Sequence, residues 1–242
     1  TITDAFPLQF TNGVLDALAV HEVYSFLHGL SGYNKIRMHP KDQEKTAFMA
    51  EWGVFIVVVM MFGLKTAPTT FQHIIMEIFG EFITAFMQVF LDDFAMYSQE
   101  GEQLQHLRLC LEKCRGYQLS LNPTKCVFGV TSGTQLGHIV IKDGIAVDPD
   151  KVEAILEAPA LTTATTLSRF LGQIRWHNWM LRCLGDLVIP LHVAVHRTPF
   201  QWTEMEDKAY RALKVLLSQA RVVQPPIGST LIQLTELKRY QP

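Results

Sequence analysis

The chain has 242 residues, of which 48% are hydrophobic and 18% are charged, a globular composition with enough apolar material for one or two modest domains. Its formal net charge of −2 and isoelectric point near 6.5 argue against a strongly basic nucleic-acid binder but leave local basic patches open. No apolar run reaches the ~18 residues of a membrane-spanning helix, so we expect no membrane partner.

The first residues and the cysteines indicate the cellular compartment of the protein. The opening residues TITDAFPLQF contain no initiator Met and no basic or apolar leader, so we expect no signal peptide and interpret the chain as a fragment or excised domain. Cys110, Cys114, Cys126 and Cys183 form no C-x-x-C pair, which favours a reduced intracellular protein, cytoplasmic or nuclear. His106, Cys110 and Cys114 share one face of an expected helix, but the second ligand pair typical of structural zinc sites is not evident.

The first third of the chain predicts strands followed by a helix. Val23–Leu27 has the pattern of a strand that runs into a Gly-containing turn. Glu51–Leu64 is a β-branched and aromatic run, long enough for a strand pair or for one long buried strand. Pro68 then opens a helix whose apolar residues follow the i, i+3, i+4, i+7 rule and predict a buried face of Phe71, Ile74, Ile75, Ile78, Phe79 and Phe82.

The middle of the chain predicts two hairpins around a second helix. Ala85–Ser98, which reads AFMQVFLDDFAMYS, has two apolar runs joined at an Asp-Asp pair and predicts the first hairpin. Asn122 and Pro123 form a turn before a short strand, and Gly133–Val147 predicts the second hairpin, with its turn at Lys142-Asp143-Gly144. The helix between the two hairpins has an expected apolar face of Leu104, Leu107, Leu111 and Cys114.

Beyond residue 147 the pattern becomes helical. Asp148 and Pro149 cap and open one helix, and further helices are expected over Thr165–Ile174 and Glu204–Gln219. A β-rich α+β unit is therefore followed by a helical unit, with the boundary near Ala146–Asp150.

The two adjacent acids of the first hairpin, Asp92 and Asp93, allow two interpretations. Side-by-side carboxylates repel each other, and burying them is costly unless a cation or hydrogen-bond donors meet them. An ordinary solvated turn explains them, because Asp is common in turns. A rigid hairpin that presents two carboxylates also suits divalent metal ions, which take oxygen ligands and serve nucleotidyl transfer in pairs.

The wider sequence decides between these interpretations. VFLDDFAMYS resembles the aromatic and Asp-Asp signature of the reverse transcriptases of gypsy-type LTR retrotransposons. SFLHGLSGYNKIRMHPKDQEKTAF, VVMMFGLKTAPTTFQ, LSLNPTKCVFG, LGHIV…DGIAVDPDKVEAI, LSRFLGQIRWHNWML and PFQWTEMEDKAYRALK resemble further blocks of the same family, in the same order. The resemblance covers nearly the whole chain.

This resemblance implies an α+β right-hand polymerase, an RNA-directed DNA polymerase that acts on an RNA or DNA template-primer and dNTPs. A palm, an antiparallel sheet backed by helices, is expected over residues 1–147 with partial fingers. A mainly helical thumb and the start of the connection are expected over 148–226, and a remnant tail of a deleted ribonuclease H region over 227–242. The family also assigns Asp92 and Asp93 as ligands of Mg²⁺ or Mn²⁺.

The resemblance assigns two further groups of residues. Tyr33 matches the aromatic residue beneath the incoming sugar, where a ring excludes a 2′-hydroxyl, and Phe62 and Gly63 match the nucleotide-pocket strand. Without the family context, Tyr33 could simply be a packed turn aromatic and His138 a surface or core histidine. The primer-grip hairpin matches Leu136, Gly137 and His138.

One position breaks the family pattern. The motif that carries the first catalytic Asp reads S-F-L-H-G-L-S-G-Y here, so His28 replaces that Asp. Imidazole is a poor ligand for Mg²⁺ and brings no negative charge to a site for two dications. We therefore expect metal binding to be weakened and the polymerase to be impaired or inactive.

Two departures from the family pattern near the ends of the sequence also predict a loss of function. The sequence before Phe6 lacks the family's basic finger segment, so template affinity should fall, because phosphate contacts carry most nucleic-acid binding. The run from Gln224 into Ile227 lacks the strand with the first ribonuclease H carboxylate, so we expect no ribonuclease H activity. The alternative to an impaired polymerase is a non-catalytic remnant that binds nucleic acid or a protein partner.

Overall fold

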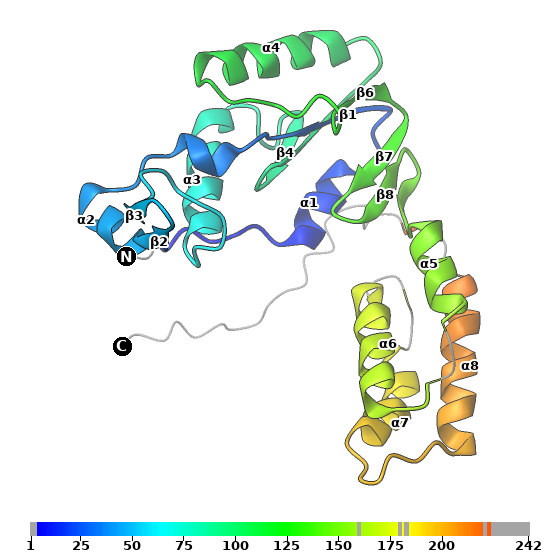
Figure 1. Ribbon diagram of the computed structural model, residues 1–242. Coiled ribbons are helices and arrows are strands. Elements are labelled where there is room, and N and C mark those ends of the chain that lie inside the picture. Colours follow the sequence, from blue (N-terminus) through cyan, green and yellow to red (C-terminus); the bar gives the residue numbers. More distant parts are fainter. Residues whose placement is uncertain (1–3, 159–160, 179–180, 182–183, 220–221, 224–242) are drawn as a thin grey trace, which may run out of the picture.

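A computed structural model of the chain describes residues 4–158, 161–178, 181, 184–219 and 222–223 (Figure 1). Cys183 and the expected tail at 227–242 lie outside the described residues. Sheet elements extend up to Ala146 and helices follow from Pro149, so the chain has the α+β organisation that its sequence predicts. Over the part of the chain that is described, no helix is long and apolar enough to span a bilayer.

The first half of the chain is built on a four-stranded sheet in the order β4-β5-β1-β6. The strands are β1 (Val23–His28), β4 (Met87–Phe90), β5 (Asp93–Ser98) and β6 (Val127–Val130). β1 pairs antiparallel with β5 along its whole length, from Val23 opposite Ser98 to His28 opposite Asp93. The strand near Val23 and the hairpin at the Asp-Asp pair are therefore confirmed.

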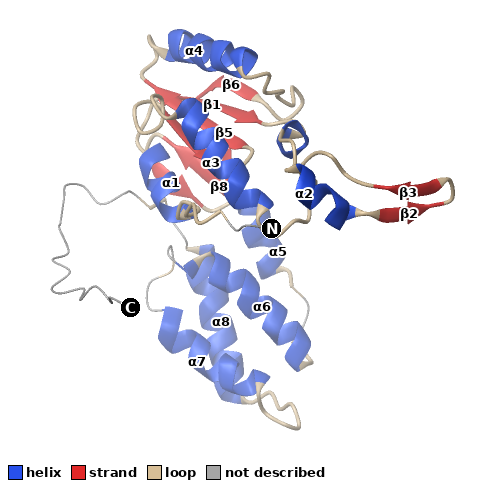
Figure 2. Cartoon of the chain, turned by 90° about the vertical axis from the view of Figure 1, so that its left-hand side faces the viewer, coloured by secondary structure: helices blue, strands red, loops and turns tan. Residues whose placement is uncertain are grey.

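The two faces of this sheet bury different side chains, because successive strand residues point to opposite sides. Leu27 and Phe94 belong to a core formed with α3 (Ala67–Phe79) and α4 (Gln103–Gly116). Phe26 and Ala95, one position away from Leu27 and Phe94, belong to a second core shared with Tyr24 and α1 (Thr11–Leu18). The sheet is thus the middle of three layers (Figures 1 and 2).

A small sheet completes the layer on the α1 side. It is the meander β7 (Ser132–Gln135), β8 (His138–Ile141) and β9 (Gly144–Ala146), and its Val140 and Ile145 are buried in the core that contains Tyr24. The predicted hairpin is confirmed as β8 and β9, and β7 is an additional strand. β7 approaches β1 so closely that a Cβ on Gly133 would lie 2.1 Å from Phe26 Cε2.

The second half is a helical unit with its own core. Its helices are α5 (Pro149–Leu156), α6 (Ala164–Trp176), α7 (Leu184–Val195) and α8 (Glu204–Ser218). Asp148 caps α5 as expected, and capping boxes begin α6 at Thr163 and α8 at Thr203. The core side chains include Leu167, Ile174, Leu191 and Leu213, each 0% exposed. α7 contains Pro190 and was not predicted from the sequence.

For the run Glu51–Leu64 the sequence predicts a strand pair or one long buried strand, and the buried strand is wrong. The run contains β3 (Gly53–Phe55), which pairs with β2 (Phe48–Ala50) just before it in a separate two-stranded sheet, exposed on both faces. A one-turn helix α2 (Pro40–Gln43) precedes it, with 3-10 turns at 32–35 and 44–46. This hairpin projects from the body of the molecule (Figure 2).

The apolar face predicted for α4 is confirmed only in part: Cys114 is buried and Leu107 packs against the core, but Leu104 and Leu111 turn outward. Leu104 is 82% exposed and Leu111 is 40% exposed, whereas Cys110 and Cys114 are buried. The small cysteines let the helix lie close to α3 and the sheet, and the larger leucines turn outward because that space is already filled.

The turn between β4 and β5 is fixed by a buried glutamine of α3. Gln72 is 0% exposed, donates from Nε2 to the Val89 carbonyl at 3.2 Å and accepts from the Leu91 amide at 2.6 Å. Leu91 has a φ of 54°, a left-handed conformation that costs a branched L-residue about 1–2 kcal/mol. The two hydrogen bonds of Gln72 offset that cost and hold the turn that carries the acids.

Buried histidines join the small sheet to the helical unit. His138 of β8 is 4% exposed and stacks on Trp176 of α6, with ring centroids 5.7 Å apart. His177, 2% exposed, meets it edge-on at 6.4 Å. Burial, followed by the charges of His177 and Lys151, lowers the pKa of His138 to about 4. Burial also lowers the pKa of His177.

We predict that Gln72→Leu lowers the free energy of unfolding by about 2–4 kcal/mol, because the Leu91 N–H and the Val89 carbonyl would lose their partner. Urea unfolding measures this change. Gln105→Leu, an exposed glutamine of α4, is the matched control and should shift stability by less than about 0.5 kcal/mol. Equal stability of the two variants would contradict the proposed role of Gln72.

We also predict that stability falls as the pH drops from about 6.5 to about 4. The folded chain holds His138 neutral while the unfolded chain protonates it, so acid favours unfolding, by up to about 3 kcal/mol for this residue. Thermal unfolding across this pH range tests the effect. His138→Phe keeps a ring on Trp176 but cannot titrate, so its profile should be flatter. His177 and His21, whose pKa values burial also lowers, contribute to the remaining slope.

Candidate active site at the carboxylate hairpin

The register of the central sheet brings His28 to the two acids. His28, the last residue of β1, is paired with Asp93, the first residue of β5. Its Nδ1 lies 2.8 Å from Asp93 Oδ1 and its Nε2 lies 3.6 Å from Asp92 Oδ2. The side chains of His28, Asp92 and Asp93 are 22%, 34% and 43% exposed, so the cluster opens to solvent. The two acids are thus held at a rigid turn, beside an imidazole.

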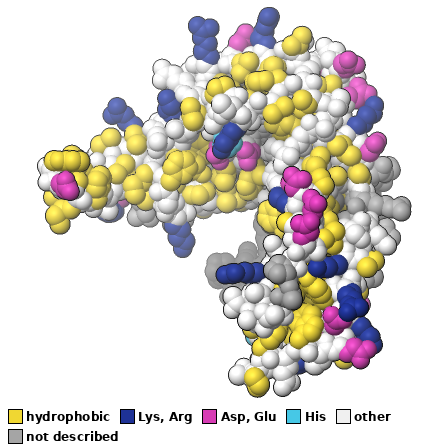
Figure 3. Space-filling model, turned by 45° about the vertical axis from the view of Figure 1, so that its right-hand side comes forward, with side chains coloured by type: hydrophobic (Ala, Val, Ile, Leu, Met, Phe, Trp, Pro, Cys, Tyr) yellow, Lys and Arg dark blue, Asp and Glu magenta, His cyan; other side chains and the backbone are white. Residues whose placement is uncertain are grey.

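A lysine from a distant loop completes the cluster. Lys125 Nζ lies 3.4 Å from His28 Nε2. Both contacts are satisfied when the His28 imidazole donates from Nδ1 to Asp93 and accepts at Nε2 from the Lys125 ammonium. The same loop is tied to β1, because the Asn122 amide donates to the His28 carbonyl at 2.8 Å. In the space-filling view, basic, histidine and acidic side chains gather in one hollow framed by hydrophobic ones (Figure 3).

Tyr33 and Phe62 meet next to this cluster. Tyr33, 6% exposed, stacks on Phe71 at 4.7 Å, and Phe62 tilts against it at 4.9 Å. Burial raises the pKa of the Tyr33 phenol, and the charge of Asp92 raises it further. Gly63 has a φ of 89°, which suits a glycine at the bend that follows Phe62. The structure therefore brings together Tyr33, Phe62 and the acids, which the sequence had separated.

The third expected group lies elsewhere. Leu136 and Gly137, with φ of 49° and 76°, form the two-residue turn between β7 and β8, the geometry of a tight hairpin. Lys151 Nζ of α5 donates to the Gly137 carbonyl at 3.0 Å, and His138 packs on α6. Gly137 and His138 therefore contact the helical unit, whereas Leu136 packs against the core that contains Tyr24.

The residues present do not fit a site for two magnesium ions. Among the described residues, no group of three or more His, Cys, Asp and Glu side chains is arranged to hold a metal ion. Asp93 Oδ1 is engaged by the imidazole, and Lys125 adds a positive charge next to it. Hard dications prefer oxygen ligands and net negative charge, and the cluster supplies two carboxylates against one ammonium.

The alternative zinc ligands on α4 are occupied in other ways. The Cys110 thiol donates to the Cys114 sulfur, and this bond, together with burial, raises the pKa of Cys110. The ring of His106 stacks on Phe86 with centroids 4.0 Å apart. These contacts account for the three residues as packing groups of α4.

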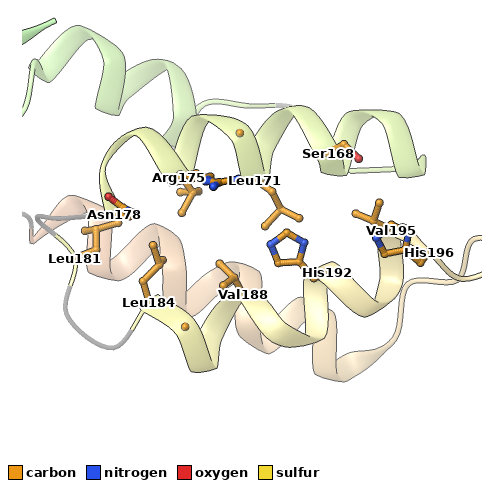
Figure 4. A pocket seen from close by; sticks show the side chains of 13 residues that line it. Ser168, Leu171, Arg175, Asn178, Leu181, Leu184, Val188, His192, Val195 and His196 are labelled. Carbon is orange, nitrogen blue, oxygen red and sulfur yellow. The ribbon is translucent and has the colours of Figure 1, made fainter. Parts of the chain in front are cut away.

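Gln72 and Lys125 were not predicted from the sequence. Gln72 follows Phe71 inside an apolar helical pattern, where a buried polar residue is the available signal. Lys125 is 97 positions from His28, so no local spacing connects them. A separate cavity of about 820 Å³ lies between α6 and α7, lined by apolar side chains with Arg175, His192 and His196 (Figure 4). It contains none of the residues assigned from the sequence.

The sequence of the chain matches a known protein family and is similar to transposon polyproteins. The family described as reverse transcriptase (RNA-dependent DNA polymerase) matches residues 5–140, more than half of the chain. The retrovirus-related Pol polyprotein from transposon opus of Drosophila melanogaster is 34% identical over 192 residues, which are 79% of this chain and 19% of that protein. The transposon Tf2-3 polyprotein of Schizosaccharomyces pombe is 26% identical over 92% of the chain and 16% of its own length. The chain spans about a fifth of these relatives.

The fold agrees with solved structures. A foamy viral protease-reverse transcriptase in complex with dsDNA superposes with a TM-score of 0.86 at 16% identity, over 95% of this chain and 48% of that one. The same viral protein in complex with an RNA/DNA hybrid gives a TM-score of 0.83 at 16% identity, over 92% of this chain and 31% of that one. The α+β polymerase fold expected from the sequence is confirmed. The chain belongs to the reverse transcriptase family of RNA-directed DNA polymerases.

Proposed function

We propose that this chain is the reverse transcriptase domain of a gypsy-type LTR retrotransposon polyprotein, with its nucleotidyl transfer impaired at His28. The observation that carries the proposal is the 2.8 Å contact between His28 Nδ1 and Asp93 Oδ1, where the family motif has an Asp. Residues 1–147 are proposed as palm and partial fingers, and 148–226 as thumb and start of the connection. The transposon relatives and the polymerase fold support this assignment.

The proposed impairment of nucleotidyl transfer follows from the charges around Asp92 and Asp93. In such polymerases, divalent ions activate the primer hydroxyl and stabilise the leaving pyrophosphate. At this site the imidazole contributes no negative charge, and Lys125 stands at its other nitrogen. Losing one metal ligand costs roughly 3–5 kcal/mol of transition-state stabilisation, which corresponds to about 10²–10⁴ in rate. Mg²⁺ or Mn²⁺ is therefore the proposed but weakened cofactor of Asp92 and Asp93.

The proposed substrates are a template-primer and dNTPs. Tyr33, stacked between Phe71 and Phe62 next to Asp92, is suited to lie beneath an incoming sugar. Leu136, Gly137 and His138 form a rigid turn suited to a primer strand. A solved relative holds an RNA/DNA hybrid and another holds dsDNA, which supports nucleic acid as the ligand here.

A second candidate is a non-catalytic domain that binds nucleic acid or a protein partner. It is favoured by the same imidazole, because a fold can keep its nucleic-acid surface after its metal site is lost. Divalent-metal binding separates the two candidates, since polymerase chemistry requires it and binding alone does not.

We predict that the unmodified chain shows little primer extension on an RNA template with Mg²⁺ or Mn²⁺, and that His28→Asp raises the rate by about 10²–10⁴. His28→Asn is the matched control, because it removes the imidazole without adding a charge and should stay close to the unmodified chain. Robust synthesis by the unmodified chain would contradict the impairment.

We predict a parallel gain in metal affinity, measured without turnover. Mn²⁺ added to the unmodified chain should broaden the NMR signals of residues near Asp92 and Asp93 only at high concentration, and His28→Asp should lower the required concentration at least tenfold. Asp92→Asn combined with His28→Asp should abolish the gain. Tight Mn²⁺ binding by the unmodified chain would show that the cluster holds a metal ion as it stands.

A further inference from the structure

The small sheet and the helical unit have separate apolar cores. The small sheet packs Leu136, Val140 and Ile145 into the core around Tyr24, whereas α5–α8 bury a different set of side chains, and in the described residues the two sets share no member. α5 lies between the small sheet and α8 (Figures 1 and 2). The position of the β7–β8 turn, residues 136–138, relative to the helices therefore depends on a few specific contacts rather than on shared packing.

Lys151 of α5 contacts both sides of this junction. Its Nζ donates to the Gly137 carbonyl at 3.0 Å and lies 5.8 Å from the centroid of the Trp176 ring, within the range of a cation–π interaction. Trp176 in turn stacks on His138, the residue that follows the turn glycine. Lys151 is thus bonded to the backbone of the turn and lies over the α6 ring on which the turn rests.

The β7–β8 turn fits closely against these two side chains. A Cβ on Gly137 would lie 2.6 Å from Lys151 Nζ and 3.3 Å from Trp176 Cζ2, so a larger residue would displace one of them. The edge strand β9 is held separately, by backbone hydrogen bonds of 2.9 Å in both directions between Ile145 and Val223. Those bonds do not involve the turn, which leaves Lys151 as its charged partner in the helical unit.

The ammonium of Lys151 also affects the two buried histidines beside it. Burial and the charge of His177, followed by the charge of Lys151, lower the pKa of His138 to about 4. Burial, followed by the charge of Lys151, lowers the pKa of His177, and the nearby Asp148 opposes that shift. Loss of the ammonium should therefore raise the pKa of both imidazoles, which makes its position at the junction measurable.

We infer that Lys151 is a positioning residue that holds the β7–β8 turn in place for a primer strand. The primer part of this inference rests on the proposed function, which assigns the turn to the primer. A strand end that takes part in nucleotidyl transfer must be held to within about 0.5 Å, and the groups that hold it need support from further side chains. Lys151 supplies that support from α5, because its ammonium bonds the Gly137 carbonyl beside the ring that packs on His138.

Hydrogen exchange of the backbone amides in the whole 242-residue chain tests the contact without turnover. Lys151→Met removes the ammonium but keeps an unbranched side chain, and it should speed exchange over residues 136–141 by about tenfold, because the turn loses its charged partner. Lys151→Arg should keep the slow exchange, since a guanidinium also donates to a carbonyl. NMR titration should show a raised pKa of His138 in Lys151→Met and an unchanged one in Lys151→Arg.

Lys214→Met is the matched control. Lys214 Nζ donates to the Leu156 carbonyl at 2.8 Å and lies 4.6 Å from the Tyr210 ring, so it makes the same two kinds of contact, entirely within the helical unit. Its loss should leave exchange over residues 136–141 unchanged. Circular dichroism checks that all variants are folded. Unchanged exchange of the turn in Lys151→Met, or equal acceleration in Lys214→Met, would overturn the inference.

Binding of a fluorescent RNA/DNA template-primer over a range of salt concentrations tests the consequence for the primer. Lys151→Met should weaken binding by roughly threefold or more without changing the salt dependence, and Lys151→Arg should restore it. A salt slope reduced by about one would show that Lys151 contacts a phosphate itself, which would also overturn the inference. If the unmodified chain binds no template-primer, the proposed function and the primer part of the inference fail, and hydrogen exchange still decides whether Lys151 holds the turn.

Discussion

The antiparallel pairing of β1 with β5 is the interaction on which the rest of this structure depends. It joins residues about seventy positions apart and lies at the centre of the four-stranded sheet, so both apolar cores are built on it. Because the side-chain period of a strand is two, a slip of one residue would exchange the faces and bury the wrong set. The same register places His28 opposite Asp93.

The geometry of the candidate site depends on that pairing and on the hydrogen bonds of Gln72. Gln72 reaches from α3 to the turn, so that Leu91 keeps a costly backbone conformation and the two acids stay at the tip of rigid strands. Nothing in this scaffold is altered by the histidine, since His28 continues β1 normally. The departure from the family is therefore one of charge and ligand chemistry, within an unaltered β1–β5 pairing.

The apolar hairpin β2–β3 differs from the central sheet in how its side chains are covered. Its strands carry Phe48 and Phe55 on one face and Met49 and Val54 on the other, yet in the described residues the rest of the chain covers neither face. The central sheet and the helical unit satisfy their own apolar surfaces internally. The strand conformation of the hairpin follows from its local sequence, whereas its exposure depends on what the rest of the chain places around it.

The sequence by itself determined the elements and the family. Local periodicity and capping residues gave β1, α3, the β4–β5 hairpin, α5, α6 and α8, because these signals lie within a few neighbouring positions. Ordered motifs identified Asp92, Asp93 and the replacement at His28. Only the tertiary structure decided which face of α4 is buried, that most of Glu51–Leu64 is exposed, that Lys125 reaches His28, and that Gln72 bonds the turn before the acids. Those outcomes depend on which distant surfaces compete for the same space, and spacing along a chain does not carry that information.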